Sequence, residues 1–315
     1  MCLPALLATI RGSLLRMFRP SLPLSLATVA AVLCAPGPRL SVADGKDAAL
    51  VRVLVPRIAW HRDGWSADTV LPPPVAQSQK PLEFICPAAD EEWIEGRTYN
   101  LVWQWQGQIA RVGLTYDYEV VGLANRTRGK ESIAVTGRSA NRGYATFVPK
   151  WIDSPGFTLH LDGYDASGNR VASCERFIRF RPAEAADIHG TFICVLRDHE
   201  RLYYFHDDKL TRLHIVSTAR AGYLTPPMHP GLTRGGVRMG QVFYKDENAW
   251  SNEFKCPMPY WMAITSSGSH GIHATTPGAY RHLGSPASHG CVRQHLEDAR
   301  ILYSMVKIGT PVYVF

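Results

Sequence analysis

Between residues 81 and 181 the chain consists of short β-type runs separated by turn-forming residues. The runs are YNLVWQWQG, VGLTYDYEVVGL, ESIAVTG, ATFVPKW, FTLHLDGYD and RVASCERFIRF. Between them lie NRTRGK, SANRG, DSPG and DASGN, which are rich in the residues that turns require. Apolar and polar residues alternate in LTYDYEV and FTLHLDGYD, as in a strand with one buried face. This pattern predicts an antiparallel β-sandwich and a mainly β chain.

The sandwich is predicted over residues 81–182, and it resembles immunoglobulin-like modules at the level of pattern alone. No function is transferred from that resemblance. Trp103 and Trp105 are two positions apart, so they face the same side of a strand. Core or edge packing is the favoured interpretation of this pair, and a platform on which carbohydrate stacks is the alternative.

Residues 1–43 have the features of a secretory signal peptide. They contain arginines but no acidic residue, followed by the apolar run LPLSLATVAAVLCAP and by small residues that suit a cleavage site at Ala43. An uncleaved anchor helix is the alternative, although Pro36 and Pro38 end the apolar run early. Met17 begins a more compact signal and is an alternative start. Each of these interpretations predicts export, with membrane contact only through the signal or the anchor.

The charge of the chain does not indicate a nucleic-acid partner. The 34 Lys and Arg residues exceed the 27 Asp and Glu residues, for a formal charge of +7. Four of the basic residues belong to the signal, which leaves a small excess spread over the remainder. Residues 44–80 contain a short apolar piece and then LPPPVAQSQK, whose prolines predict an N-terminal segment and linker rather than a helix.

Five cysteines remain after the signal, an odd number for a compartment in which disulfides persist. Cys86 and Cys174, in the first and last predicted strands of the sandwich, could form a disulfide. Cys194 and Cys256 either pair with each other or are buried thiols. Cys291 is the fifth, and its surroundings predict a reactive thiol.

Residues 183–315 are predicted to form a second β-rich domain. HDDK lies between the apolar runs of LYYFHDDKLTRLHIVST and predicts a hairpin turn. The segment QHLEDARILYSMVKIG has helical spacing of apolar residues, acidic residues in its first turn, Lys307 in its last turn and Gly309 as a stop. A final strand, PVYVF, follows. The helix comes directly after the sequence Ser288-His289-Gly290-Cys291-Val292-Arg293.

A thiol at the start of a helix and near an arginine is expected to have a lowered pKa, which favours the nucleophilic thiolate. Gly290 allows a tight turn, from which backbone N–H groups could stabilise an oxyanion. A nucleophile needs a base, and His273 in SHGIHATTP lies eighteen positions before Cys291. The pattern predicts nucleophilic catalysis by Cys291 with His273 as the base.

This segment resembles the L,D-transpeptidase catalytic domain (YkuD-type). It has a histidine in GIH-x-T, then a spacer, and then SHGC-V-R, with His273 eighteen positions before Cys291. The resemblance covers residues 188–315, because STARAGYLTPP, MPYWMAIT and LEDARILYSMVKIGTPVYV also look like segments of that family. Ala274 departs from the glycine that the family usually has after the base. The longer loop TPPMHPGLTRGG is a second departure, which puts the shape of the substrate groove in doubt.

The resemblance implies an exported enzyme of the periplasm or cell envelope of a bacterium, active in peptidoglycan biosynthesis, cell wall biogenesis and cell shape. Its substrates would be peptidoglycan stem peptides, both as donor and as acceptor. Cys291 would attack after the third residue with loss of D-Ala, and an amine would resolve the thioester, forming a crosslink. His273 would accept the thiol proton, and the N–H groups of Gly290 and Cys291 would bind the oxyanion. His289 and Ser288 would shape the loop, and substrate contacts are expected at Ser288, Tyr260 and Arg293.

Three alternatives stay open on the sequence alone. With water as acceptor, the same fold would be an L,D-carboxypeptidase or an amidase, and therefore a hydrolase. With an inactive catalytic domain, the chain would be a wall-binding module. A zinc site is disfavoured, because His270 and His273 are three apart in a strand-to-loop segment and would face opposite sides. No cofactor and no metal are expected.

Overall fold

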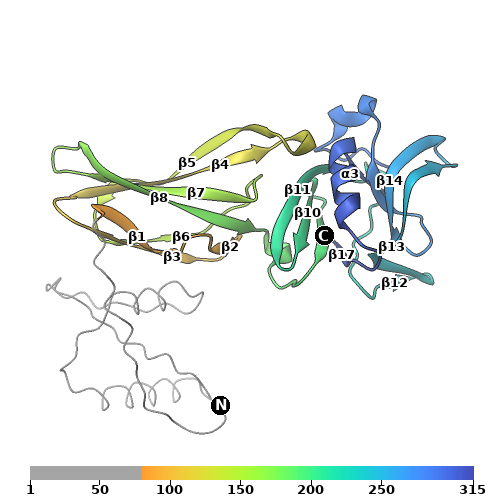
Figure 1. Cartoon of the computed structure of the whole chain (residues 1–315), viewed down its shortest axis with the longest axis horizontal. Helices are drawn as coiled ribbons and strands as arrows, with labels where there is room; N and C mark the ends of the chain where they lie inside the picture. Colours follow the sequence, from red (N-terminus) through yellow and green to blue (C-terminus); the bar gives the residue numbers. More distant parts are fainter. Residues whose placement is uncertain (1–79) are drawn as a thin grey trace, which may run out of the picture. The chain divides into compact units, whose positions relative to one another are not determined.

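The computed structural model describes residues 80–315. The signal predicted at residues 1–43 lies outside the described residues, as does the predicted segment and linker from residue 44 to residue 79. Over residues 80–315, no helix has both the length and the apolar character needed to cross a membrane. The chain is mainly β, as predicted, with strands in two regions of its sequence (Figure 1).

The first region is a sandwich of two sheets. The smaller sheet has the order β1 (Leu82–Cys86), β3 (Tyr99–Trp105) and β6 (Tyr144–Phe147). The larger sheet has the order β2 (Glu92–Ile94), β8 (Arg170–Arg181), β7 (Gly156–Tyr164), β4 (Arg111–Val121) and β5 (Thr127–Ala140). All pairs are antiparallel except β2 with β8, which run parallel. The predicted sandwich is confirmed in its strands and layers.

Alternating side chains of the two sheets form the sandwich core. Trp93, Phe157 and Leu159 are completely or almost completely buried in it. Trp103 joins this core and donates from its Nε1 to Asn141 Oδ1 at 3.0 Å, whereas Trp105, at the strand end, is 40% exposed. Packing is therefore the role of Trp103.

The cysteines do not pair as the sequence suggested. Cys174, Cys194 and Cys256 are free thiols in the structure. Neither the Cys86–Cys174 disulfide nor the Cys194–Cys256 disulfide is formed. Cys194 is fully buried in a strand among apolar side chains, which is the other of the two interpretations that its sequence allowed.

The second region contains a nine-stranded mixed sheet, numbered along the chain from β9 to β17. Its order is β12 (Thr233–Arg234), β13 (Val237–Ser251), β14 (Cys256–Thr265), β15 (Gly271–Ala274), β16 (Val292–Gln294), β11 (Lys209–Ser217), β10 (Arg201–His206), β9 (Phe192–Leu196) and β17 (Val312–Val314). The pairs β15–β16 and β17–β9 are parallel. The parallel pair β15–β16 matters for the site, because it joins the two motifs singled out in the sequence.

Local sequence explains the turn and the helix of this region. Asp207 and Asp208, between β10 and β11, both have positive φ angles, as the two central residues of a type I′ hairpin turn require. Helix α3 (Leu296–Met305) begins after His295, whose side chain accepts a hydrogen bond from the N–H of Glu297. The helix ends earlier than predicted. Lys307 lies beyond it, and Lys245 Nζ instead donates to the carbonyls of Tyr303 and Val306 at this end.

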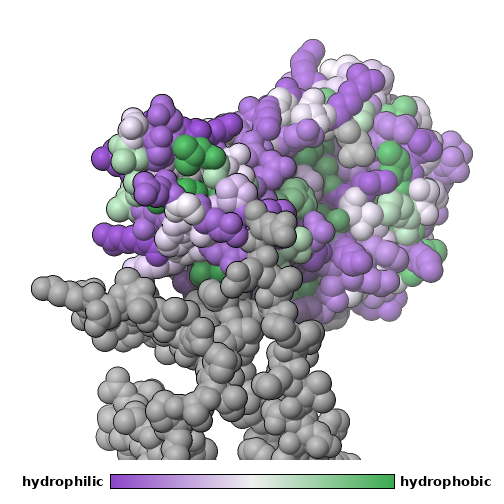
Figure 2. Space-filling view, turned by 60° about the vertical axis from the view of Figure 1, so that its left-hand side comes forward, coloured by the Kyte–Doolittle hydropathy of each residue, from purple (hydrophilic) through white to green (hydrophobic). Residues whose placement is uncertain are grey.

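Three short 3₁₀ turns complete the described chain: η1 (Leu123–Asn125), η2 (Ala183–Ala185) and η3 (Pro277–His282). Polar contacts join the sandwich to the second region. The buried guanidinium of Arg181 donates to Glu92 and to the carbonyls of Ala185 and Asp208. Trp151 donates to Tyr203 Oη at 3.2 Å and stacks on His199. The surface is largely hydrophilic on the face seen in Figure 2, with apolar residues in small separate patches.

Candidate active site

Cys291 directly precedes strand β16, at the end of the sheet pair that joins β15 to β16. The parallel register sets Ile272 beside Val292 and His273 beside Arg293. By continuation of this register Cys291 lies beside Gly271, whose backbone hydrogen-bonds to the thiol. The half-buried Cys291 also packs against a small apolar cluster that contains Trp261. The strand pairing thus brings the thiol next to the segment that carries His273.

This position corrects the expected helix-mouth site. Strand β16 and His295 separate Cys291 from α3, which begins only at Leu296. The field of a helix terminus fades within about one turn, so α3 does not activate this thiol. Burial is the largest effect and raises the pKa of Cys291, while the Gly271 hydrogen bond and the charge of Arg293 lower it. The predicted lowering of the pKa is therefore wrong for the free protein, in which the thiol is protonated at neutral pH.

His273 is held in one orientation and one tautomer. Its side chain is buried, with 5% exposed. Nδ1 lies 2.7 Å from the carbonyl oxygen of Ala274 and donates to it, so Nε2 is left without a proton. Burial, helped by the charge of Arg293, lowers the pKa of His273 to about 4, and the bond to Ala274 opposes this shift. At neutral pH His273 is therefore a neutral imidazole that can accept a proton at Nε2.

Trp261 connects the thiol and the imidazole. Its ring centroid lies 5.7 Å from that of His273, and the same ring belongs to the cluster on which Cys291 packs. Gly271 makes this packing possible, because a Cβ there would lie 2.5 Å from Trp261 Cη2. Sequence reasoning did not single out Trp261 or Gly271. The sequence features that could have pointed to them are the tryptophan in YWMAIT and the glycine that begins GIHA.

Ser288 and Gly290 shape the loop before the cysteine. Ser288 is fully buried, and its N–H donates to the carbonyl of Thr218 at 2.8 Å. Its Oγ accepts a hydrogen bond from the N–H of Gly290 at 3.0 Å. Gly290 has a φ of +138°, and a Cβ there would meet His270 Nε2 at 2.9 Å and the carbonyl of Leu224 at 3.0 Å. The loop role expected for Ser288 fits these contacts. The N–H of Gly290, by contrast, is occupied, so in this conformation it is not free to bind an oxyanion.

His289 lies in a cluster of aromatic and basic side chains. Phe254, in the turn between β13 and β14, stacks on it with ring centroids 4.5 Å apart. Tyr223 packs edge-on at the same distance, and Arg220 Nη2 lies 2.9 Å from His289 Nε2. Because the guanidinium can only donate, Nε2 accepts and the ring is neutral. His289 thus fastens the β13–β14 turn to the motif loop, which supports a positioning role.

The remaining predicted residues lie at two places. Arg293, on β16, donates from Nη1 to the carbonyl of Ala287 at 3.3 Å and lowers the pKa values of His273 and Cys291. Tyr260, on β14, has a positive φ angle of 59° and packs against Tyr303 of α3. Arg293 therefore anchors the loop. Substrate contacts of Arg293, Ser288 and Tyr260 stay predictions.

The histidines that invited a zinc interpretation have other partners. His270 Nε2 lies 3.2 Å from the carbonyl of Leu224, and its Nδ1 lies 3.1 Å from Ser269 Oγ. His273 is bonded to Ala274 as described. Within residues 80–315 no group of three or more His, Cys, Asp or Glu side chains is placed to hold a metal ion.

The structure thus places a neutral imidazole on β15 and a protonated thiol directly before β16, an arrangement that can support catalysis by a cysteine nucleophile. The family model of the L,D-transpeptidase catalytic domain, YkuD, matches residues 190–314. This match agrees with the resemblance expected for residues 188–315. No curated protein matches the chain.

Several solved structures of L,D-transpeptidases are similar to this chain. The catalytic domain of the E. faecium enzyme is 26% identical, covering 41% of this chain and 100% of that one, with a TM-score of 0.33. An L,D-transpeptidase from Mycobacterium tuberculosis is 17% identical, covering 72% and 95%, with a TM-score of 0.34. One from Mycobacterium smegmatis is 14% identical, covering 75% and 100%, with a TM-score of 0.34. The resemblance to the L,D-transpeptidase family rests on the match of residues 190–314.

Proposed function

We propose that this protein is an exported cysteine L,D-transpeptidase that acts on peptidoglycan stem peptides. The observation that carries the proposal is the placement of Cys291 beside the strand of a neutral, oriented His273 within a YkuD-family domain. The division into a signal (1–43), a linker segment (44–80), a sandwich (81–182) and a catalytic domain (183–315) belongs to the proposal. Export would place the enzyme in the periplasm or cell envelope of a bacterium.

In the acylation step, Cys291 Sγ attacks the carbonyl carbon of the third stem residue while its proton passes to His273 Nε2. Because Nδ1 already donates to Ala274, the imidazolium that forms keeps its orientation. The tetrahedral intermediate collapses when His273 returns the proton to the departing amine. D-Ala leaves, and a thioester to Cys291 remains.

In the transfer step, an amine of a second stem peptide attacks the thioester. His273 accepts the proton of that amine and then returns it to the thiolate as the new amide forms. The N–H of Cys291 is the proposed oxyanion donor. The N–H of Gly290 could join it only by exchanging its bond to Ser288 Oγ for one to the substrate.

Acylation by a carbapenem tests the nucleophile. A relative, LdtMt1, has been solved in complex with imipenem. Intact-mass measurement should show one adduct on the purified protein and none on Cys291→Ala, while Cys256→Ala, which removes a neighbouring thiol, should still be labelled. An unlabelled wild-type protein would instead favour a wall-binding module without activity.

Product analysis tests the acceptor. Stem tetrapeptide substrates incubated with the purified enzyme should give dimers linked through third residues, with release of D-Ala. Trimmed monomers alone would show that water is the acceptor, and the enzyme would then be an L,D-carboxypeptidase.

A further inference from the structure

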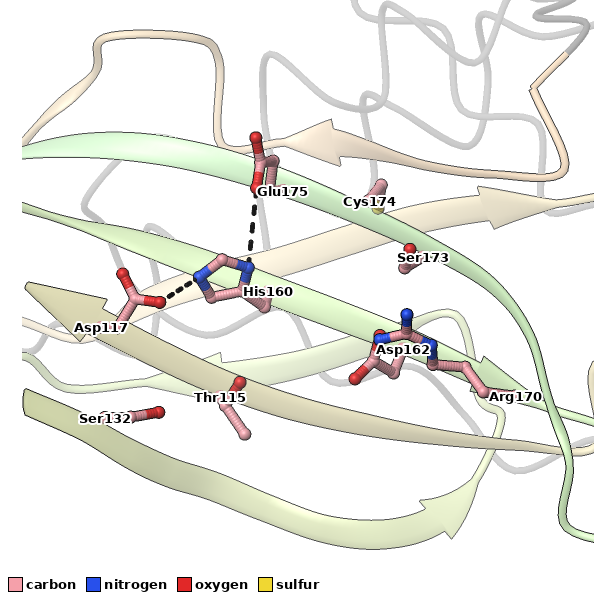
Figure 3. Close-up of a pocket in the computed structure, with 9 residues that line it drawn as sticks. All are labelled: Thr115, Asp117, Ser132, His160, Asp162, Arg170, Ser173, Cys174 and Glu175. Carbon is pink, nitrogen blue, oxygen red and sulfur yellow. Dashed lines mark hydrogen bonds and ion pairs between the residues drawn. The ribbon is translucent and has the colours of Figure 1, made fainter.

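The outer face of the larger sandwich sheet carries a polar groove that the catalytic chemistry does not use. It has a volume of about 480 Å³ and lies over strands β5, β4, β7 and β8 (Figure 3). Nine residues line it, and most of them are polar: Thr115, Asp117, Ser132, His160, Asp162, Arg170, Ser173, Cys174 and Glu175. Alternation along the strands turns the polar residues away from the sandwich core.

The polar groups of the groove are held in place before any ligand arrives. His160 Nε2 lies 2.7 Å from Asp117 Oδ2, and its Nδ1 lies 3.7 Å from Glu175 Oε2, so both edges of the ring are engaged (Figure 3). Lys130 pairs with Asp117 at 3.0 Å, and Arg170 pairs with Asp162 at 3.1 Å. The side chains of Asp117 and Asp162 are only 15% and 24% exposed. Such fixed groups bind a ligand at a lower entropic cost than mobile ones.

An aromatic ring packs over a glycine of the sheet at each end of this polar row. Phe177, which pairs with Thr158 and is 46% exposed, covers Gly156, where a Cβ would meet its ring at 2.6 Å. Tyr164 covers Gly113 in the same way at 3.5 Å, and Arg138 lies over that ring. Thr158, His160 and Asp162 are the outward residues of β7 between the two rings. At roughly 3.3 Å per residue the row from Thr158 to Tyr164 is about 20 Å long.

The charges of the groove indicate the class of ligand. Three carboxylates, those of Asp117, Asp162 and Glu175, face two cations, Lys130 and Arg170, and each of these five groups has a partner of opposite charge or a histidine. The groove therefore has no surplus positive charge for an anionic ligand. Uncharged hydroxyl and amide groups, which both donate and accept, can bond to these groups without displacing an ion pair.

We infer that this groove binds an extended, uncharged oligosaccharide. Hydroxyl groups of successive sugar rings would bond to Asp117, Asp162, Ser173 and Glu175. The apolar face of one sugar ring would stack on the exposed ring of Phe177. This inference concerns the sandwich alone and does not depend on the catalytic proposal.

Calorimetric titration of the full-length protein with the hexamer of β-1,4-linked N-acetylglucosamine tests the inference. Binding should weaken at least about tenfold, or about 1.4 kcal/mol, in Phe177→Ala and in Asp162→Ala. Tyr144→Ala is the matched control, because Tyr144 is a 61% exposed aromatic residue on the smaller sheet. Its affinity should equal that of the wild type. Cys291→Ala should also bind normally, which separates this site from the catalytic one.

Three results would overturn the inference. The first is the absence of sugar binding by the wild-type protein, and the second is binding of a stem peptide in place of the sugar. The third is an equal loss of sugar affinity in Phe177→Ala and Tyr144→Ala. Circular dichroism of each variant shows whether the sandwich is still folded, and Asp162→Asn, which keeps the shape of the side chain, distinguishes lost hydrogen bonding from misfolding.

Discussion

Asp153 of the sandwich and Arg201 of β10 form a buried ion pair. Arg201 Nε donates to Asp153 Oδ1 at 2.6 Å, and Arg201 Nη2 donates to Asp153 Oδ2. The two side chains are only about a tenth exposed. Arg201 also donates from Nη1 to the carbonyl of its neighbour Glu200. A residue of the sandwich thus helps to hold the start of a strand in the catalytic region.

Glu200 continues this network toward Cys291. Its buried carboxylate accepts hydrogen bonds from the N–H and the hydroxyl of Thr218, both at 2.6 Å. The carbonyl of Thr218 in turn accepts from the N–H groups of Ala287 and Ser288. A chain of hydrogen bonds therefore runs from Asp153 to the loop that carries Cys291.

Asp153→Ala should destabilise the protein by about 3–5 kcal/mol, because it leaves the Arg201 guanidinium buried without its partner. The double variant Asp153→Ala/Arg201→Met should recover most of this loss. Urea unfolding of the full chain measures both values. Arg300→Ala breaks an exposed pair with Glu297 and should cost far less stability. Similar losses of unfolding free energy in Asp153→Ala and Arg300→Ala would show that burial does not set the cost of breaking an ion pair.

His273→Ala should slow acylation by a carbapenem at least about 100-fold, because it removes the proton acceptor. His295→Ala should keep most of this rate. It removes the side chain that caps α3 and should cost about 1 kcal/mol of stability. The acylation rate, followed by mass spectrometry, and the unfolding free energy separate the two effects. Equal losses of rate would mean that the base is misassigned.

Gly271→Ala should slow acylation about 100-fold, since the new methyl group would push Trp261 away from His273 and Cys291. Gly278→Ala is the matched control, because nothing lies within 4 Å of the added Cβ and the φ angle there is not positive. This control should react within about twofold of the wild type. A Gly271→Ala enzyme with a normal rate would rule out the packing role of Trp261.

Stability should fall as pH falls from about 6.5 to about 4. Burial lowers the pKa of both His273 and His214 to about 4, so in this range the unfolded chain takes up protons that the native chain does not. Each histidine contributes a slope of about 1.4 kcal/mol per pH unit. Urea unfolding between pH 4.5 and 7.5 measures the slope, which should become shallower in His214→Gln. A flat profile would refute the burial effect.

Sequence patterns found the elements and residues whose signals are local. Alternation along β4 and β7 predicted the sandwich, and the two aspartates of HDDK predicted the hairpin turn. The motif around Cys291 and the histidine at position 273 indicated the L,D-transpeptidase family, because the spacing between them is a property of the sequence itself.

Tertiary structure decided how those residues behave. The β15–β16 register places Cys291 directly before a strand and away from the helix, and burial raises the pKa that a helix terminus was expected to lower. Residues far apart in the chain also decide which N–H groups are free to bind an oxyanion and which cysteines lie close enough to pair. The physical reason is that side-chain alternation and turn preference are set by near neighbours, whereas desolvation and charge interactions depend on everything that packs around a group. Local order could therefore be predicted from the sequence, and the electrostatics of the site could not.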